Sequence, residues 1–423
     1  MAQGLQGGAA AGGGGEVKRS FLFLQGPSTP FFARLADRLR REGHAVHRIN
    51  FCAGDALYWG GRRSWWFGHD TSRLREYLDD KYRRYGITDQ VLFGDRRPVH
   101  RPAVEHGEAC GVRTHVFEEG YFRPWWVTLE REGVNGHSLL PRDPDWFREA
   151  GARLAETPQA VEFFSPFHTR AIHDVAYHVA GLANPVLFPR YRTHAGVTAP
   201  VEYAGYVRRF AWLRAIRRRE QRRAREMLAS GLPYYLLPLQ LNTDAQVRDH
   251  SRFGHMGEVI EHVLESFARH APHDTRILVK NHPLDMGLMN FGRIIGDCER
   301  RFDIRGRVDY LEQGDTTAFV SHAHGVVTVN STVGMIALEL GTPTLTLSDP
   351  IYNLPGLASQ LPLDAFWRNP VPPDQAFFAR FRRCVMHATQ LNGGFYCSTG
   401  IALAVENGAR VLGAQRSPLE ALA

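Results

Sequence analysis

The sequence predicts an α/β protein built from two units with parallel sheets, which face each other across a cleft. Short apolar runs alternate with helical stretches, and the pattern occurs once in each half of the chain. Such alternation is typical of parallel sheets covered by helices. The length of 423 residues suits two domains better than one ordinary core. Hydrophobic residues make up 43% of the chain and charged residues 22%, which indicates a folded globular protein.

The first unit is predicted to span residues 18–228, after a Gly/Ala-rich flexible tail over residues 1–17. Its first helix, over residues 30–42, places its apolar side chains on one face. Residues 160–230 are expected to form a helical, basic connector to the second unit. Strands are predicted over residues 21–24, 45–51, 90–94 and 114–117.

The same pattern restarts in the second unit, which is predicted to span residues 229–362. One of its helices places Val259, Val263 and Phe267 on a single face. The last segment, residues 363–423, is predicted to be helical. Helices are predicted over residues 257–270 and 333–340, and strands over 234–239, 276–280, 308–311, 325–329 and 344–347.

Two segments at strand ends of the second unit are candidates for binding a phosphate. Asn330-Ser331-Thr332 follows an apolar strand and opens a helix, where free N–H groups and the helix dipole attract an anion. Lys280-Asn281-His282-Pro283 ends another strand and offers an ammonium and an imidazole. Each segment has a plainer interpretation, as a helix cap or as a structural histidine. Because ligands of open α/β sheets bind at the carboxyl ends of the strands, the pair favours one shared phosphate site.

Polar residues at strand ends of the first unit are candidates for the opposite wall of the cleft. Glu118-Glu119-Gly120 follows the fourth strand, and adjacent carboxylates there could act as nucleophile or general base, or form a solvated acidic turn. Gln25-Gly26-Pro27-Ser28 follows the first strand and could hold an acceptor or a phosphate. Asn50 and Asp55 follow the second strand, where they either face the same cleft or belong only to a turn.

Composition and missing motifs narrow the functional classes. The sequence contains neither a GxGxxG dinucleotide fingerprint nor a P-loop. The five cysteines are scattered without the spacing of a disulfide framework or a zinc site, so we expect the protein to lie in the reducing cytoplasm. The sequence also has no clustered Asp/His metal motif, so we expect no metal.

Charge and hydropathy indicate an anionic partner. The formal net charge is +7, and nine arginines lie within residues 208–225. An excess of positive charge favours binding to nucleic acid, to an acidic membrane surface or to anionic substrates. No nucleic-acid-binding module is recognised, so we expect no nucleic-acid partner. No apolar run reaches the roughly 18 residues that span a bilayer, so any membrane contact is expected to be peripheral.

Several of these segments, in one register, resemble the KpsS-type capsule polysaccharide family. The likeness runs in order from about residue 20 to about residue 360 and depends on several motifs together. The segments are Phe21-Leu22-Phe23-Leu24-Gln25-Gly26-Pro27, Arg48-Ile49-Asn50-Phe51, Val116-Phe117-Glu118-Glu119-Gly120-Tyr121-Phe122-Arg123-Pro124, Leu239-Gln240-Leu241-Asn242-Thr243-Asp244, Lys280-Asn281-His282-Pro283 and Val329-Asn330-Ser331-Thr332-Val333-Gly334.

The resemblance implies a GT-B fold, in which an acceptor domain and a nucleotide-sugar domain, both Rossmann-like, face each other and the C-terminal segment returns to the first domain. It implies a β-linked 3-deoxy-D-manno-oct-2-ulosonic acid (Kdo) transferase that uses CMP-Kdo. Such enzymes start the Kdo linker on a phosphatidylglycerol-type lipid at the inner face of the cytoplasmic membrane. The implied partners are this donor, the anionic lipid and the capsule assembly and export proteins.

The resemblance also implies roles for individual residues, with no metal needed because protein groups hold the phosphate. Glu118 or Glu119 would carry the catalytic carboxylate, at a turn where many relatives have Asp. The predicted nucleotide-sugar site consists of Gln240, Lys280, His282, Pro283, Asn330, Ser331 and Thr332. The predicted acceptor site or cleft consists of Gln25, Gly26, Ser28, Asn50, Asp55 and Arg123.

Two other functions stay open at this point. The chain could be a non-catalytic GT-B component of a capsule assembly and export complex, docked to the membrane through its basic helix. It could also be a transferase for another CMP- or UDP-sugar, such as a sialic acid.

Overall fold

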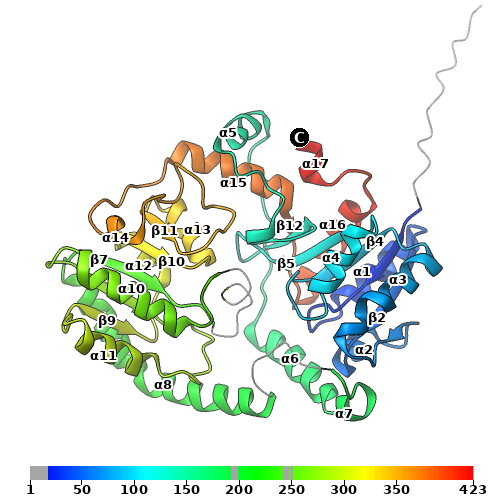
Figure 1. Ribbon diagram of the computed structural model, residues 1–423, viewed down its shortest axis with the longest axis horizontal. Coiled ribbons are helices and arrows are strands. Elements are labelled where there is room, and N and C mark those ends of the chain that lie inside the picture. Colours follow the sequence, from blue (N-terminus) through cyan, green and yellow to red (C-terminus); the bar gives the residue numbers. More distant parts are fainter. Residues whose placement is uncertain (1–17, 192–198, 242–246, 248–250, 423) are drawn as a thin grey trace, which may run out of the picture.

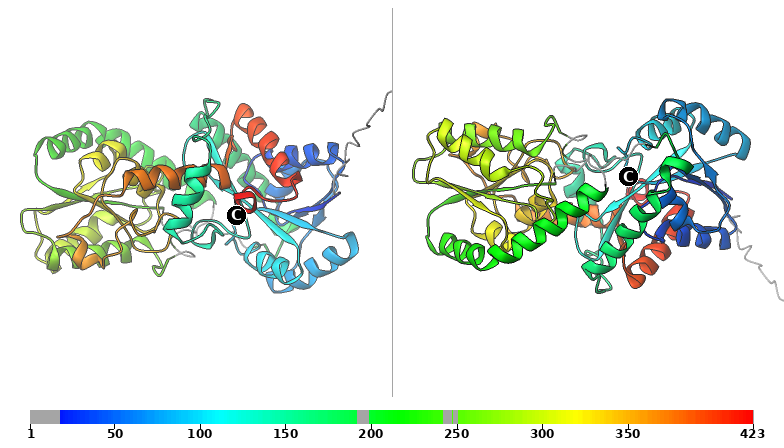
Figure 2. Two further views of the ribbon diagram at one scale, coloured as in Figure 1. Left: turned by 90° about the horizontal axis from the view of Figure 1, so that it is seen from above. Right: turned by 90° about the horizontal axis from the view of Figure 1, so that it is seen from below.

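The computed structural model describes residues 18–191, 199–241, 247 and 251–422, which form two lobes (Figure 1). The predicted flexible tail over residues 1–17 lies outside the described residues, as do Asn242, Thr243 and Asp244 of the family motif. Each lobe is built on its own sheet, and α15 crosses between them (Figure 2, left).

The first sheet has seven strands in the order β12-β6-β5-β4-β1-β2-β3. Neighbouring strands in the series β3-β2-β1-β4-β5 pair in parallel, whereas β6 pairs with β5 and with β12 in antiparallel fashion. The strands are β1 (Ser20–Phe23), β2 (Ala45–Asn50), β3 (Trp65–Trp66), β4 (Asp89–Phe93), β5 (Arg113–Glu119), β6 (Trp126–Arg131) and β12 (Gln390–Asn392). Helices α1 (Phe31–Arg41), α2 (Ala53–Trp59), α3 (Leu74–Tyr85) and α4 (Arg101–Ala109) connect them. We did not predict β3, β6 or β12.

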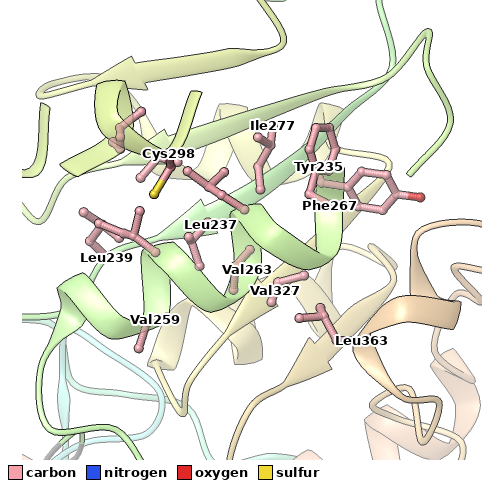
Figure 3. Close-up of a cluster of buried hydrophobic side chains, with 14 of the residues drawn as sticks. Tyr235, Leu237, Leu239, Val259, Val263, Phe267, Ile277, Cys298, Val327 and Leu363 are labelled. Carbon is pink, nitrogen blue, oxygen red and sulfur yellow. The ribbon is translucent and has the colours of Figure 1, made fainter. Parts of the chain in front are cut away.

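The second sheet has five parallel strands in the order β11-β10-β7-β8-β9. Val259, Val263 and Phe267 recur at four-residue intervals on α10 and pack on Tyr235 and Ile277 of the sheet (Figure 3). The strands are β7 (Tyr234–Pro238), β8 (Arg276–Lys280), β9 (Val308–Leu311), β10 (Gly325–Thr328) and β11 (Thr344–Thr346). The helices are α10 (Met256–His270), α11 (Phe291–Arg301), α12 (Thr316–His322) and α13 (Thr332–Glu339).

Both parallel sheets have the same strand order. Counted within each lobe, the parallel strands lie in the order 3-2-1-4-5, which is that of the Rossmann fold. The order reverses between β1 and β4 in the first lobe and between β7 and β10 in the second, and ligands bind at the carboxyl ends of strands at such points. The predicted fold class, two Rossmann-like α/β domains in the GT-B arrangement, is confirmed.

The C-terminal segment connects the two lobes. Helix α14 (Leu363–Phe366) still packs on the second lobe, and its Phe366 belongs to that core. Helix α15 (Gln375–Thr389) packs against α5 (Pro144–Arg153), and α16 (Ser398–Gly413) packs on α1. The two lobes are joined by a shared hydrophobic core, which includes Phe147 of α5, Met335 of α13 and Phe381 of α15. The short helix α17 (Pro418–Leu422) follows.

Three helices make up most of the segment that we predicted as a basic connector. They are α6 (Phe167–Gly181), α7 (Asn184–Leu187) and α8 (Ala199–Ala229). Ala224 and Met227 of α8 are buried together with Leu236 and Leu278 of the second sheet. Helix α8 therefore belongs to the second lobe, although we placed the boundary after it at residue 228. None of the described helices combines the length and the apolar character needed to cross a bilayer.

Candidate active site

His282 follows the carboxyl end of β8, with one ring nitrogen engaged by its own loop. Its backbone N–H donates to the Asn281 side-chain oxygen (2.7 Å), and its Nδ1 accepts a hydrogen bond from the Leu284 N–H (3.1 Å). Because Nδ1 is an acceptor, the ring proton of the neutral form sits on Nε2. Burial and nearby positive charges lower the pKa of His282 to about 4. At neutral pH His282 is therefore an uncharged imidazole that offers Nε2–H as a donor.

A buried polar network holds the loop that carries His282. Asn281 Nδ2 donates to carboxylate oxygens of Glu312 (2.8 Å) and Asp285 (3.2 Å). Lys280 Nζ donates to the backbone carbonyls of Asn281 (2.7 Å) and Glu312 (3.5 Å). Burial lowers the pKa of Lys280 to about 8, although the Glu312 carboxylate opposes the shift. We predicted Lys280 as a direct phosphate ligand, but these contacts favour a positioning role behind His282. The following Pro283 is exposed.

Asn330, Ser331 and Thr332 lead from β10 into α13. Gln240, just after β7, holds Asn330 in place: its Nε2 donates to Asn330 Oδ1 (2.9 Å), and its Oε1 accepts from the Asn330 N–H (3.3 Å). Ser331 Oγ caps the helix by accepting from the Val333 N–H (3.1 Å), so the capping interpretation applies to Ser331. The Ser331 hydroxyl proton and the hydroxyl of half-buried Thr332 remain as donors beside the positive end of the helix dipole.

A buried tyrosine supports this turn. The Tyr352 hydroxyl donates to the Ser331 carbonyl oxygen (2.6 Å). A Cβ at position 334 would lie 2.3 Å from the Tyr352 hydroxyl oxygen, so Gly334 is needed for the tyrosine to reach Ser331. The glycine of the family motif thus fixes the first turn of α13 through packing.

Glu118 and Glu119 are the last two residues of β5, rather than a turn after it as we predicted. Successive strand residues point to opposite faces, so the two side chains diverge. Glu118 Oε1 accepts from the Glu119 N–H (3.0 Å). Glu119 Oε1 accepts from the Tyr396 hydroxyl (3.2 Å) and lies 3.6 Å from a guanidinium nitrogen of Arg170. We did not predict Arg170 or Tyr396, because neither residue lies in a recognisable motif.

The two lobes bring positive charges together at the cleft. Arg123 in the β5–β6 loop and Arg170 on α6 both come from the first lobe, and both contribute, after burial and Lys280, to lowering the pKa of His282. Arg123 is exposed, and its Nε donates to the Gly120 carbonyl (3.3 Å). Because Arg123 and Arg170 act on His282, the residues that follow β5 and β8 lie near each other, and the positive charge around His282 suits an anionic ligand.

Sequence comparisons identify the family. The model of the family described as capsule polysaccharide biosynthesis protein matches residues 88–396. This chain belongs to that family. It is 35% identical over 399 residues to the capsule polysaccharide modification protein LipB of Neisseria meningitidis serogroup B, over 90% of this chain and 92% of that protein. It is 33% identical over 382 residues to the capsule polysaccharide export protein KpsS of Escherichia coli, over 89% of this chain and 97% of that protein.

Among solved structures, a likeness is found to the β-Kdo 2,7 transferase of Thermosulfurimonas dismutans KpsC. The TM-score is 0.44 at 12% identity, and the alignment covers 93% of this chain and 100% of that chain. The family model and the identities to LipB and KpsS, not this structural likeness, confirm the family resemblance that the motifs indicated, at the level of capsule polysaccharide biosynthesis.

Three residues that we predicted for the cleft lie in a buried network of the first lobe instead. Gln25 Nε2 donates to Asp55 Oδ2 (3.3 Å) and to the Tyr177 hydroxyl (3.2 Å). Arg48 donates to Asn50 Oδ1 (2.9 Å) and lies 3.3 Å from Asp55 Oδ1. Because Tyr177 belongs to α6, the network fastens that helix to the lobe. Gln25, Asn50 and Asp55 therefore have a structural role.

The loop after β1 packs closely on α1. A Cβ at position 26 would lie 2.7 Å from the ring of Phe32, so Gly26 allows this close packing. Ser28 is half-buried in the same loop.

One group of possible metal ligands occurs among the described residues. Asp79 of α3, His106 of α4 and Cys110 bring their ligand atoms within 4.8 Å of one another. None of these residues belongs to the candidate active site, so this group is separate from it.

Proposed function

We propose that this protein transfers Kdo from CMP-Kdo to a phosphatidylglycerol-type lipid at the cytoplasmic face of the membrane, which starts the Kdo linker of a capsular polysaccharide. The observation that carries the proposal is the neutral His282, on which the charges of Arg123 and Arg170 act, while Arg170 itself lies 3.6 Å from the Glu119 carboxylate at the end of β5. Membership of the capsule polysaccharide biosynthesis family supports the pathway. The motif resemblance supports the donor.

The C-terminal lobe would hold the leaving group. When the bond between the anomeric carbon and CMP breaks, its electrons pass to a phosphate oxygen. Among the described residues, no group hydrogen-bonds His282 Nε2, so its proton is available for that oxygen. The hydroxyls of Ser331 and Thr332 and the N-terminus of α13 add preorganised donors. The buried network around Lys280 keeps the His282 loop in place without itself binding the donor.

The N-terminal lobe would act on the sugar and the acceptor. Glu119 is the stronger candidate for the catalytic carboxylate, because it adjoins Arg170, which also influences His282. If transfer inverts the anomeric configuration, the Glu119 carboxylate would accept the proton of the acceptor hydroxyl as the hydroxyl oxygen bonds to the anomeric carbon. If transfer retains the anomeric configuration, the Glu119 carboxylate would first bond to the anomeric carbon as CMP leaves. The acceptor oxygen would then displace the carboxylate, with the hydroxyl proton passing to the phosphate of the released CMP. Arg123 and Arg170 provide cationic partners for the carboxylate of Kdo.

A transfer assay tests the proposal. The purified full-length chain is incubated with CMP-Kdo and a phosphatidylglycerol-type lipid, and CMP release and the mass of the lipid are measured. We expect CMP release together with a lipid that has gained one Kdo. Absence of CMP release from folded protein that still binds vesicles would support the non-catalytic interpretation instead. If the protein instead transfers the sugar of a different CMP-sugar, and CMP but not UDP raises its melting temperature, the proposed site holds but the donor is not CMP-Kdo.

A further inference from the structure

Helices α6 and α7 carry a stripe of apolar side chains that faces solvent. Ile172, Val175, Val179, Leu182 and Val186 follow one another at intervals of three or four residues, which places them on one face of a helical segment. Their side chains are 44% to 83% exposed. A helix that covers a core would bury such a stripe, so this one needs another apolar partner.

The opposite side of the same segment is the polar one, and it packs on the first lobe. The Tyr177 hydroxyl lies 2.9 Å from Cys52 Sγ inside the buried network described above. The Tyr58 hydroxyl donates to the His173 carbonyl (2.9 Å). Asn184 at the start of α7 accepts from the Ala53 N–H through Oδ1 (2.8 Å). Polar contacts thus fasten α6 and α7 to the lobe with their apolar stripe outward, so the exposure is a built feature of the fold.

The arginine-rich helix α8 meets the start of α6, the helix that carries most of this stripe. The ring of Phe167 at the start of α6 lies 6.3 Å from that of Phe210 on α8. Both helices lie along the lower edge of the molecule in Figure 1 and in front in the view from below in Figure 2. Arginines outnumber acidic residues on the exposed surface of α8: its Glu220 is buried, and its exposed Glu226 lies 3.4 Å from Arg222. The exposed arginines on this helix are Arg208, Arg214, Arg217, Arg218, Arg219, Arg222 and Arg225.

We propose that this face, formed by the apolar stripe of α6–α7 and the arginines of α8, docks the protein on an anionic phospholipid bilayer. The stripe would lie in the interface between headgroups and acyl chains, and the arginines would contact the phosphates. The charge argues against a second copy as the occupant, because two arginine-rich helices would repel each other. This inference deepens the proposed function, since a lipid acceptor is presented at the same kind of surface.

Vesicle flotation of the full-length protein tests the proposal. Vesicles contain phosphatidylcholine alone or with phosphatidylglycerol, and we expect binding to the second kind that weakens with added salt. The double variant Val175→Asp/Val179→Asp should bind at least about 100-fold more weakly, because it replaces inserted apolar groups with charges. Val371→Asp is the matched control, since Val371 is 64% exposed in a loop elsewhere and should behave as wild type.

A second pair of variants tests the arginines separately. Arg218→Glu/Arg225→Glu should weaken vesicle binding by about tenfold or more at low salt and by less at high salt. This expectation follows because each basic residue near an anionic membrane surface contributes roughly 1 kcal/mol to binding. Arg293→Glu on α11 is the control, because that side chain is 81% exposed and lies on another helix.

Three results would overturn the proposal. In the first, phosphatidylglycerol does not increase vesicle binding by the wild-type protein. In the second, the Asp variants bind vesicles as the wild-type protein does. In the third, light scattering shows a dimer without lipid, and the Asp substitutions abolish that dimer. Kdo transfer to a detergent-dispersed acceptor reports on the proposed function separately. Transfer that persists without vesicle binding rejects only the docking face, and vesicle binding without any transfer rejects only the enzymatic proposal.

Discussion

Replacement of His282 by alanine should weaken donor binding far more than folding. The Nε2–H of the neutral ring would donate to a charged phosphate oxygen, and a hydrogen bond to a charged group contributes about 1.5 to 3 kcal/mol. His282→Ala is therefore expected to raise the dissociation constant for CMP by roughly 10-fold to 150-fold. The folded protein loses only the hydrogen bond from the Leu284 N–H to Nδ1, which is about 1 kcal/mol.

Isothermal titration calorimetry with CMP, paired with chemical denaturation, measures both effects. His262→Ala is the matched control, because His262 is also half-buried and burial also lowers its pKa, but it lies on α10 away from the cleft. A variant that unfolds easily yet binds CMP as tightly as wild type would show that His282 is a structural residue and not a phosphate ligand. Affinity for CMP-Kdo that falls from pH 6 to pH 7 in wild type alone would show that His282 binds as a cation, against its lowered pKa.

Glu119, Gly334 and Glu130 each allow a further test. Glu119→Gln should lower the rate of Kdo transfer by about 10²-fold to 10⁴-fold with an unchanged melting temperature, and by more than Glu118→Gln does; equal effects would contradict the assignment. Gly334→Ala should destabilise the protein by about 1 to 3 kcal/mol in denaturant titrations and weaken CMP binding, because its Cβ would displace Tyr352, whereas Gly296→Ala on α11 should not. Burial raises the pKa of Glu130 from its ordinary value of 4.5 to about 7. Between these two pH values the carboxyl group of Glu130 is protonated in the folded state and ionised in the unfolded state. This contribution to stability is lost as the pH rises through 7, so the unfolding free energy of wild type relative to Glu130→Gln should fall between pH 5 and pH 8, and a constant difference would contradict it.

The strands that form the cleft could be predicted because they are continuous apolar runs. The bounds of β8 and β9 agree with the prediction, and those of β7 and β10 differ by one residue. Strand β12 could not be predicted, because its three residues become a strand only by pairing with β6, which is far away in the sequence. Helix α8 was assigned to the wrong lobe because its many arginines conceal the few apolar residues, such as Met227, that pack on the second sheet.

The candidate site was predictable in its motifs but not in the direction of its side chains. A sequence indicates which polar residues end a strand, but not whether they turn into the cleft or back into the domain. Gln25 and Asp55 turn inward and meet Tyr177, and Lys280 turns back onto carbonyl oxygens. Only the fold brings Tyr396, which precedes α16, beside Glu119 on β5.

A crystal structure of the protein with bound CMP would locate the phosphate site. A phosphate oxygen of CMP should lie about 3 Å from His282 Nε2, at the N-terminal end of α13 and on the side that faces Glu119 across the cleft. CMP bound elsewhere would contradict the account. The open pocket between α8 and the loop after β8, which Arg208, Trp212 and Tyr310 line, is the clearest competing location.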